Sequence, residues 1–585
     1  MCIRDSIQAV THRVKAVAGQ FSDGEESALP VLTNSMLVTE SMPLPVRPLQ
    51  TKTFEFKRLK NYKSTTLRNH KLTLEFTSNP AWYAVQALPY MMEYPYECTE
   101  QTFSRYYANS IASHIANKHP RIKQIFDQWK SAGKEALLSN LEKNQELKYL
   151  LLEETPWVMN AQDETERKKR VGLLFDLNKM SNELERAKKK LIKAQVSNGG
   201  FTWFPGMPES RYITQHVVTG FGHLDHLGIE SVRKDKAVWN MLKKAIGYLD
   251  IRLKEDYDNL LKYNANLEQQ HVSNLQVHYL YARSYFKDIP VRSQSKKAFD
   301  YYKGQAGQFW LKFNKYNQGM IALGLKRYGD DKIPMSIIRS LKEFAQKSDE
   351  LGMYWKANEG GLYWYQAPIE TQALLIEAFD EVAGDRESVE EMKLWLLKQK
   401  QTQDWKTTKA TAEACYALLL RGADYLAESK LADITIGGVK LDPENDPKLK
   451  VEAGTGYFKT SWMGEEIKPE MSKVKVQNNN KVAAWGAVYW QYFEQLDKIT
   501  FAENKLQIVK KLFLEENSAT GPKLTPVAKG QVLHPGDKVK VRILIEVDRD
   551  MEYVHMKDMR AAGFEPINVM SRYRYQDGLG YYETT

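Results

Sequence analysis

The sequence has very few cysteines. Only Cys2, Cys98 and Cys415 occur among 585 residues, and their wide spacing fits neither a disulfide framework nor a zinc-binding pattern. Cysteine usage therefore does not identify a cellular compartment. The sequence also lacks any run of about 18 uninterrupted apolar residues, so we predict no membrane span in this chain. Residues 1–6 lack the apolar stretch of a signal peptide, and we expect them to be a scar or the edge of a fragment.

Signatures of bound cofactors are missing as well. The sequence contains no Asp-rich metal motif, no His-x-x-x-His pair, no P-loop and no dinucleotide fingerprint. We therefore predict no cofactor and no metal site.

The formal net charge of +10 raises the question of a nucleic-acid partner. The basic clusters at residues 167–170 and 188–190 argue against such a partner. Each lies beside glutamates on a helical stretch: Glu164, Glu166, Glu183 and Glu185. Such mixed charge is typical of solvated helix faces with i,i+4 ion pairs. We predict no nucleic-acid binding.

Strand-like sequence flanks a long helical region. Helical periodicity dominates from about residue 86 to 425, and alternating or β-branched runs lie on both sides of it. Since these flanks are both β-like, we expect the helical region to be inserted into one β-domain. The predicted strands lie at residues 14–18, 35–40, 72–77, 473–477, 483–490 and 538–547, with a turn at 23–25 and a hairpin around Gly437 and Gly438.

A helix–turn–helix motif recurs within the helical region. Each copy has the end of a helix, a turn with glycine or aromatic residues, and a new helix that begins with a polar residue. The turns lie at residues 199–204, 359–364 and 404–405. Units of this kind stack on their neighbours. Closed into a ring, they would form an α/α toroid, in which inner and outer helices alternate.

The most informative short motif is Cys98-Thr99-Glu100-Gln101. A thiol that precedes a carboxamide by three residues can condense with it, release ammonia and leave an internal thioester. Pro95 ends any preceding helix, so the motif lies in a first helical turn, where the free N–H groups favour a thiolate. The alternative is a buried structural cysteine on an amphipathic helix.

Residues 94–101, Tyr-Pro-Tyr-Glu-Cys-Thr-Glu-Gln, resemble the thioester site of the bacterial alpha-2-macroglobulins, which are relatives of the complement thioester proteins. A glycine usually precedes the cysteine in this family, and here Glu97 takes its place. The resemblance extends from about residue 10 to the C-terminus and is strongest at residues 80–115 and 190–220.

The resemblance implies a function as well. Proteins of this family are broad-spectrum endopeptidase inhibitors of the periplasm or cell envelope. A protease cuts a bait region, which would lie upstream of this chain, and the molecule rearranges. The exposed thioester then captures the protease through a lysine amine. This would make the protein a single-use acylating trap and not an enzyme. The resemblance leaves open a lipid anchor on the full-length protein, the target proteases and the bait sequence.

The fold implied by the resemblance is multi-domain α+β. An α/α toroid thioester domain is inserted in a CUB-like β-domain and flanked by macroglobulin-type β-sandwich domains. The expected domains are the end of a macroglobulin-like domain at 7–48, the first part of the CUB-like domain at 49–85, the toroid at 86–425, the second part of the CUB-like domain at 426–495, and a C-terminal macroglobulin-like domain at 496–585 that lacks a closing strand.

The resemblance also assigns roles around Cys98 and Gln101. In relatives that prefer hydroxyls, a histidine from the stretch that resembles Thr214-Gln215-His216 attacks the thioester first and gives an acyl-imidazole. His216 is therefore a candidate acyl relay, with Gln215 as the alternative occupant of that position and simple packing as the alternative role. Aromatic residues exclude water from the thioester; the candidates are Trp82, Tyr94 and Tyr96, each with ordinary core packing as the alternative, and Tyr581 and Tyr582 in the last domain.

Two other interpretations stay open. One is an enzyme built on an α/α toroid, such as a terpene cyclase, a prenyltransferase or a polysaccharide lyase. Glu359 and Glu370 could mimic a glycosidase pair, although solvated or capping carboxylates explain them better. The other is a binding module of the same family whose thioester does not form. Cys415, on an apolar helix, is predicted to be a packed thiol.

Overall fold

The computed structural model describes residues 9–30, 35–118, 122, 124–125, 128, 177–399, 405–420, 426, 430–443, 446, 449–499, 506–519, 521–547, 556, 558, 561, 563–567, 572–576 and 579–583. The chain divides into two compact units, Met1–Asp497 and Lys498–Thr585. Within the described part of the chain, no helix is both long enough and apolar enough to cross a membrane. Cys2 and the basic cluster at 167–170 lie outside the described residues.

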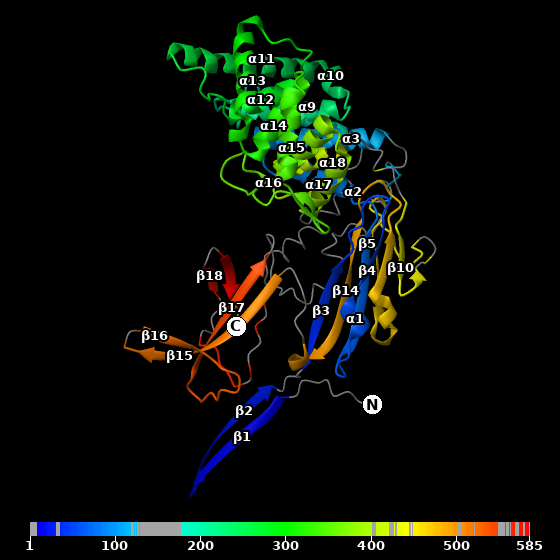
Figure 1. The fold of residues 1–585 in the computed structure, drawn as a ribbon, viewed down its shortest axis with the longest axis vertical. Coiled ribbons are helices and arrows are strands. Elements are labelled where there is room, and N and C mark those ends of the chain that lie inside the picture. Colours follow the sequence, from blue (N-terminus) through cyan, green and yellow to red (C-terminus); the bar gives the residue numbers. More distant parts are fainter. Residues whose placement is uncertain are drawn as a thin grey trace. The chain divides into compact units, whose positions relative to one another are not determined.

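The two largest sheets of the first unit are antiparallel and four-stranded (Figure 1). One sheet has the order β12-β5-β14-β3, with bounds Phe458–Met463, Arg68–Thr77, Trp485–Gln495 and Ser35–Pro43. The other has the order β11-β10-β13-β4, with bounds Val439–Lys440, Asp433–Ile436, Lys473–Gln477 and Thr51–Glu55. Both sheets contribute to one core, which includes Leu72, Phe76, Ile434, Val474 and Trp490. Each sheet joins strands from before and after the helical region.

Two details of the β-structure differ from the expectation. The strand β3, which we placed in a domain that ends at residue 48, pairs with β14 and joins the sheet that holds β5. The strands β1 (Ala9–Ala18) and β2 (Phe21–Pro30) form a hairpin that turns at residues 19–20, and residues 23–25 lie within β2. Gly19 has a φ of 64° at this turn, a conformation that glycine adopts without a steric penalty.

The predicted hairpin of Gly437 and Gly438 is confirmed. These residues join β10 to β11 with φ angles of 56° and 83°. Positive φ at both central positions is the requirement of a tight hairpin turn whose twist matches that of the strands. A short helix, α1 (Lys57–Asn61), buries Leu59 against the same core.

The helical region consists of helices joined by turns and loops (Figure 1). Their bounds are α2 (Trp82–Glu93), α3 (Thr99–Lys118), α8 (Leu177–Ala194), α9 (Arg211–His226), α10 (Ser231–Lys234), α11 (Lys236–Lys262), α12 (Asn274–Ser284), α13 (Lys296–Phe309), α14 (Lys315–Arg327), α15 (Lys332–Glu343), α16 (Pro368–Ala378), α17 (Arg386–Lys398) and α18 (Thr408–Leu419).

Six of the described helices contact one another in a cyclic order. The helix α3 packs against α9, α9 against α12, α12 against α14, α14 against α16, α16 against α18, and α18 against α3 again. The helices α2, α8, α11, α13, α15 and α17 each pack on one or more of these six. All residues from Ile369 to Ala378 of α16 are buried, whereas α15 buries only one face. This difference is typical of an inner and an outer layer of helices.

Shared hydrogen bonds define the repeated helix–turn–helix unit. The hydroxyls of Thr214, Thr371 and Thr411 each donate to the backbone carbonyl four residues earlier, at 2.8, 2.7 and 2.8 Å. The same hydroxyl of Thr214 accepts the backbone N–H of Phe201, and that of Thr411 accepts the N–H of Trp405. These threonines therefore occupy equivalent positions of the repeat. The helices α9, α16 and α18 can be aligned with one another on them.

Two tryptophans of the repeats, Trp355 just before the second turn and Trp405 in the third, share a hydrogen-bonding role. The indole Nε1 of Trp355 donates to the carbonyl of Leu341, and that of Trp405 donates to the carbonyl of Leu396, at 2.8 and 2.6 Å. Both carbonyls belong to the last turn of the preceding helix, where backbone acceptors have no partner within the helix. These two tryptophans thus satisfy helix ends as well as fill the core.

Most of the basic residues of α8 that the structure describes are ion-paired. Lys188 lies 2.5 Å from Glu185 and 2.7 Å from Asp235, and Lys190 binds Glu97. These pairs differ from the predicted i,i+4 pairs, because Lys188–Glu185 is spaced i,i+3 and the other two join α8 to Asp235 and Glu97.

The second unit contains a three-stranded antiparallel sheet and a hairpin. The sheet has the order β16-β15-β17, with bounds Gly521–Pro526, Leu506–Ser518 and Lys538–Val547. The predicted strand at residues 538–547 is confirmed. The hairpin joins β18 (Arg572–Gln576) to β19 (Leu579–Glu583).

Close packing of α3 on α9 leads to a test of the fold. A Cβ atom at Gly220, in α9, would lie 2.2 Å from the ring of Phe103 in α3. We expect Gly220→Ala to lower the free energy of unfolding by roughly 1–3 kcal/mol, since overpacking forces side chains or backbone to shift. Urea unfolding followed by circular dichroism measures the change.

The matched control is Gly304→Ala in α13, where the added Cβ would meet nothing within 4 Å. Alanine is the better helix former, so this variant should gain about 0.5–1 kcal/mol. Equal stabilities for the two variants would contradict the packing of α3 on α9.

Candidate thioester site

The Cys98–Gln101 motif begins the helix α3. The backbone carbonyl of Cys98 accepts the N–H of Thr102 at 2.9 Å, and the N–H of Cys98 donates to the side-chain Oε1 of Gln101 at 3.3 Å. The Gln101 carboxamide therefore folds back over the first turn toward the cysteine. Cys98 is only 6% exposed, and Gln101 is half-buried. The thiol and the amide thus share one turn that is largely closed to solvent.

Burial, and not the helix start, decides the ionisation of the thiol. Desolvation raises the pKa of Cys98 above its usual value, and the charge of Glu100 raises it further. Backbone N–H groups of the first turn, chiefly that of Gln101, lower it by less. The N–H groups of the helix start therefore favour a thiolate, as expected, but burial outweighs them and keeps the pKa of Cys98 above its usual value.

Neighbouring segments hold the first turn of α3 in place. The backbone N–H of Thr99 donates to the carbonyl of Trp203, in the first Gly-aromatic turn, at 3.0 Å. Arg105 donates to the carbonyl of Tyr94 at 2.7 Å. Glu97, which stands where the family has glycine, is exposed and pairs with Lys190 and Arg105. The substitution at residue 97 is therefore accommodated at the surface as an ion-paired carboxylate.

His216 lies in α9 against the same part of α3. Its ring is 5.9 Å from that of Phe103, two residues after Gln101, and it stacks on Tyr212 at 6.4 Å. The side chain is buried, and its Nε2 has no hydrogen-bond partner. Burial, together with the charge of Lys409, lowers the pKa of His216 to about 3. The imidazole is therefore neutral, with one free ring nitrogen.

Gln215 faces a different neighbour. Its Nε2 donates to the carbonyl of Leu275 at 3.1 Å, and its Oε1 accepts from Arg211 at 3.2 Å. The equivalent glutamine of the repeat, Gln372, likewise donates to backbone carbonyls. Gln215 thus has a structural role that recurs in the fold, and His216 is the residue of this pair that contacts α3.

The predicted shielding tyrosines differ in exposure. Tyr94 is half-buried and contacts the rings of Tyr90 and Tyr96 at 5.5 and 5.8 Å. Tyr96 is 67% exposed. Tyr581 and Tyr582 lie on β19, paired with β18 in the second unit. Their roles in shielding stay predictions.

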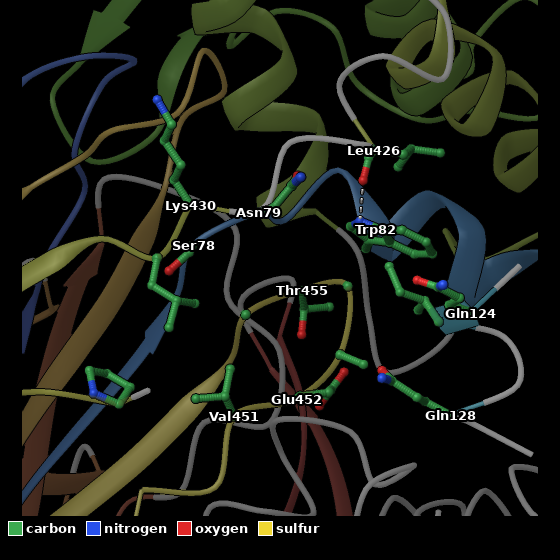
Figure 2. A pocket seen from close by; sticks show the side chains of 16 residues that line it. Ser78, Asn79, Trp82, Gln124, Gln128, Leu426, Lys430, Val451, Glu452 and Thr455 are labelled. Atoms are coloured by element: carbon green, nitrogen blue, oxygen red, sulfur yellow. Dashed lines mark hydrogen bonds between the residues drawn. The ribbon is translucent and has the colours of Figure 1, made fainter. Parts of the chain in front are cut away.

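Trp82 belongs to the core and not to the motif. Its indole Nε1 donates to the carbonyl of Leu426 at 3.1 Å, and its ring lines a pocket of about 700 Å³ between α2 and residues 451–456 (Figure 2). Polar side chains such as Gln124 and Glu452 line the same pocket.

A buried polar cluster, which we did not predict, lies beside the motif. Glu100 accepts the hydroxyl of Thr408 at 3.0 and 3.1 Å and that of Ser104 at 2.9 Å. The next residue, Lys409, places its Nζ 3.8 Å from Glu370. The repeat offered a signal for these residues, because Thr411 is equivalent to Thr214. Lys409 and Glu413 therefore occupy the positions of Tyr212 and His216.

The remaining carboxylate and thiol predictions have clear outcomes. Glu359 is exposed, as expected for a solvated carboxylate, whereas Glu370 is buried beside Lys409. Cys415 is fully buried and donates from Sγ to the carbonyl of Ala84 at 3.3 Å. The prediction of a packed thiol is confirmed.

Among the described residues, His226, Glu377 and Glu381 are close enough to share a metal ion. Arg327 already occupies the place of a cation, since it lies 2.7 Å from Glu377 and 2.5 Å from Glu381. Glu377 also accepts the hydroxyls of Tyr281, Tyr285 and Tyr416. Although burial opposes its ionisation, the charge of Arg327 and the hydrogen bond from Tyr281 help to lower the pKa of Glu377 to about 2. This cluster is a satisfied structural ion pair.

Solved structures similar to this chain include three of bacterial alpha-2-macroglobulins, each 14% identical. Native alpha-2-macroglobulin of Escherichia coli from domain MG7 to the C-terminus covers 88% of this chain, which covers 67% of that structure, with a TM-score of 0.36. For Salmonella alpha-2-macroglobulin reacted with methylamine the shares are 93% and 29%, with a TM-score of 0.35. For Escherichia coli alpha-2-macroglobulin activated by porcine elastase they are 92% and 40%, with a TM-score of 0.39. This chain thus spans less than half of the last two proteins.

A family model matches the second unit. Residues 506–585, which include β15 to β19, match the model of the bacterial alpha-2-macroglobulin MG10 domain. No curated protein matches the chain. The MG10 match confirms, over residues 506–585, the resemblance to the bacterial alpha-2-macroglobulins that the sequence predicts.

Proposed function

We propose that Cys98 and Gln101 form an internal thioester and that the chain is part of an alpha-2-macroglobulin-like endopeptidase inhibitor. The observation that carries this proposal is the first turn of α3, where the Gln101 carboxamide folds back to within 3.3 Å of the Cys98 nitrogen beside a buried thiol. The MG10 match supports it from an independent part of the chain.

Formation of the thioester requires only the side chains of Cys98 and Gln101. The Cys98 sulfur attacks Cδ of Gln101, the Cδ–Nε2 bond breaks, and the thiol proton leaves with the nitrogen as ammonia. In capture, a lysine amine of the protease attacks the same carbon. The carbon–sulfur bond breaks, an amide forms, and the proton passes to the released thiolate. Each molecule reacts once, so the protein is a trap and not a turnover enzyme.

The proposed architecture follows the same family. The cyclic order of six inner helices, with a second set packed on them, supports an α/α toroid that carries the thioester. The two four-stranded sheets, built from strands on both sides of the helical region, support a CUB-like domain that holds the toroid as an insertion. The full-length protein would act in the periplasm or cell envelope.

Protection of the thioester from water is assigned to aromatic side chains. Tyr94 is the stronger candidate within this motif, since it is half-buried between two other rings. Tyr96 is exposed on its own unit and would act only when another surface covers it. Tyr581 and Tyr582, on β19, are the further candidates.

His216 is the proposed acyl relay. Its contact with Phe103, its neutral ring and its unpartnered Nε2 suit a nucleophile that attacks an acyl carbon near the start of α3. The alternative occupant, Gln215, is bonded to Leu275 and Arg211.

The thioester is tested by intact mass and by methylamine. The native protein should be lighter than its encoded sequence by one ammonia, and methylamine should add at Gln101 and release one titratable thiol. Cys98→Ala should abolish both signals, because no sulfur remains to form the bond.

Cys415→Ala is the matched control, since it removes the other described thiol and should leave the adduct unchanged. A native protein with the full encoded mass and a Cys98 that reacts at once with a thiol reagent would identify a family module without a thioester.

The relay is tested by partitioning between nucleophiles. His216→Ala should shift transacylation from glycerol toward methylamine, because amines react with the thioester directly while hydroxyls depend on the acyl-imidazole. Gln215→Ala is the control and should leave the glycerol-to-amine ratio unchanged. An unchanged ratio in His216→Ala would reduce this histidine to a packing residue.

A further inference from the structure

The side chain of Glu100, which lies between Cys98 and Gln101 in the motif, is held by hydroxyl groups from two helices. The hydroxyl of Thr408, in the first turn of α18, lies 3.0 and 3.1 Å from the two carboxylate oxygens, so its one proton is shared between them. Ser104, one turn further along α3, donates to Oε1 at 2.9 Å. Both hydroxyl residues are buried, so little water competes for these bonds.

The start of α18 is a rigid support for this contact. The hydroxyl of Thr407, the N-cap residue, accepts the backbone N–H of Ala410 at 3.1 Å. The hydroxyl of Thr411 joins the carbonyl of Thr407 to the N–H of Trp405, and Trp405 is fully buried. Thr408 thus lies in a turn that hydrogen bonds on both sides hold in place, and a side chain supported in this way fixes its partner precisely.

A second contact holds the residue that precedes Glu100. The backbone N–H of Thr99 donates to the carbonyl of Trp203 at 3.0 Å. The first turn of α3 is therefore anchored at two adjacent residues, to the first Gly-aromatic turn through Thr99 and to α18 through Glu100. Cys98 and Gln101 directly flank these two anchored residues.

Condensation of a thiol with a carboxamide depends on placement, because both groups are weak reactants. Correctly placed groups of one molecule react faster than free molecules by very large factors, and a misplacement of about 1 Å can cost about 100-fold in rate. A contact that fixes the turn between Cys98 and Gln101 therefore acts on the rate of condensation as well as on stability.

We infer that Glu100 and Thr408 are a positioning pair for the thioester: the hydrogen bonds from Thr408 to Glu100 fix the first turn of α3 so that the Cys98 thiol lies against the Gln101 amide. This inference rests on the proposed function. It assigns neither residue a contact with the reacting atoms, because Glu100 acts through the backbone of the turn that it shares with Cys98 and Gln101.

Simple satisfaction of a buried carboxylate has a different consequence. In that case, loss of the Thr408 hydroxyl would lower the free energy of unfolding and leave the rate of condensation in the folded protein unchanged. For a positioning pair, the folded variant itself condenses more slowly. Measuring rate and stability on the same variants therefore distinguishes the two roles.

The test uses the full chain and follows the condensation directly. Ammonia opens the thioester: its nitrogen bonds to Cδ of Gln101, the carbon–sulfur bond breaks, and a proton passes to the sulfur of Cys98. After ammonia is removed, re-formation is followed as the loss of one titratable thiol and checked by intact mass.

Thr408→Val replaces the hydroxyl with a methyl group of similar size. It should slow re-formation roughly tenfold, the factor in rate that one such hydrogen bond represents. Thr408→Ser keeps the hydroxyl and should restore most of the rate. If the opened parent does not close again, the freshly purified proteins are compared, and Thr408→Val should contain a smaller fraction that lacks one ammonia.

Two further variants separate positioning from general stability. Thr371→Val is the matched control, because Thr371 is also buried and its hydroxyl donates to the carbonyl of Ala367 at the start of its own helix, α16. It should lower the midpoint of urea unfolding about as much as Thr408→Val and re-form the thioester at the parent rate. Glu100→Ala should slow re-formation, and adding Thr408→Val to it should have little further effect, because the acceptor is already gone.

The outcomes are distinct. A parent that never shows the loss of ammonia overturns the proposed function and this inference with it. A parent that forms the thioester, together with a folded Thr408→Val variant that forms it equally fast and to the same extent, overturns the inference alone. Equal slowing in Thr371→Val overturns it as well. If Thr408→Val does not fold, Glu100→Ala decides in its place, and a parent rate in that variant overturns the inference.

Discussion

The contact between α3 and α18 is the constraint on which the site depends. It joins the last helix of the cyclic order to the first, and its polar part is the pair of hydrogen bonds from Thr408 to Glu100. Residues more than 300 positions apart thus meet at one helix start. Because Glu100 lies between Cys98 and Gln101, the closure of the helical region and the geometry of the motif cannot vary independently.

Burial of the motif suits storage more than reactivity. An acyl group that must survive in water needs a dry environment, and the same environment raises the pKa of Cys98 and lowers that of His216 to about 3. The thiol is therefore neutral before condensation, and the imidazole stays neutral over the physiological range. A change that admitted water would alter both properties at once, so in the proposed trap activation and exposure would be one physical event.

Sequence reasoning succeeded where the information is local. The position of the motif at a helix start, the strands at residues 72–77 and 538–547 and the Gly437–Gly438 hairpin follow from short-range rules on helix starts, alternation and positive φ. It failed where pairing is long-range or exposure is decided by the whole fold. The pairing of β3 with β14, the burial of Glu370 and the exposure of Tyr96 depend on neighbours that spacing does not reveal. Lys409 could have been identified from the sequence, because aligning Thr214 with Thr411 places Lys409 at the repeat position of Tyr212.

The buried titratable groups at the two ends of the inner helices have opposite environments. In the last turns, Glu377 is satisfied by Arg327 and three tyrosine hydroxyls, and its pKa falls to about 2. Nearer the first turns, burial raises the pKa of Glu413 to about 8, and Nε2 of His216 has no partner. A buried ion pair contributes little net stability even when it is complete. A buried carboxyl with a raised pKa and a buried imidazole without a hydrogen-bond partner therefore bring no gain in stability that would offset the cost of burying them. Perturbed groups of this kind cluster where chemistry is done. These perturbed groups, Glu413 and His216, lie toward the end of the inner helices that also holds Cys98 and Gln101.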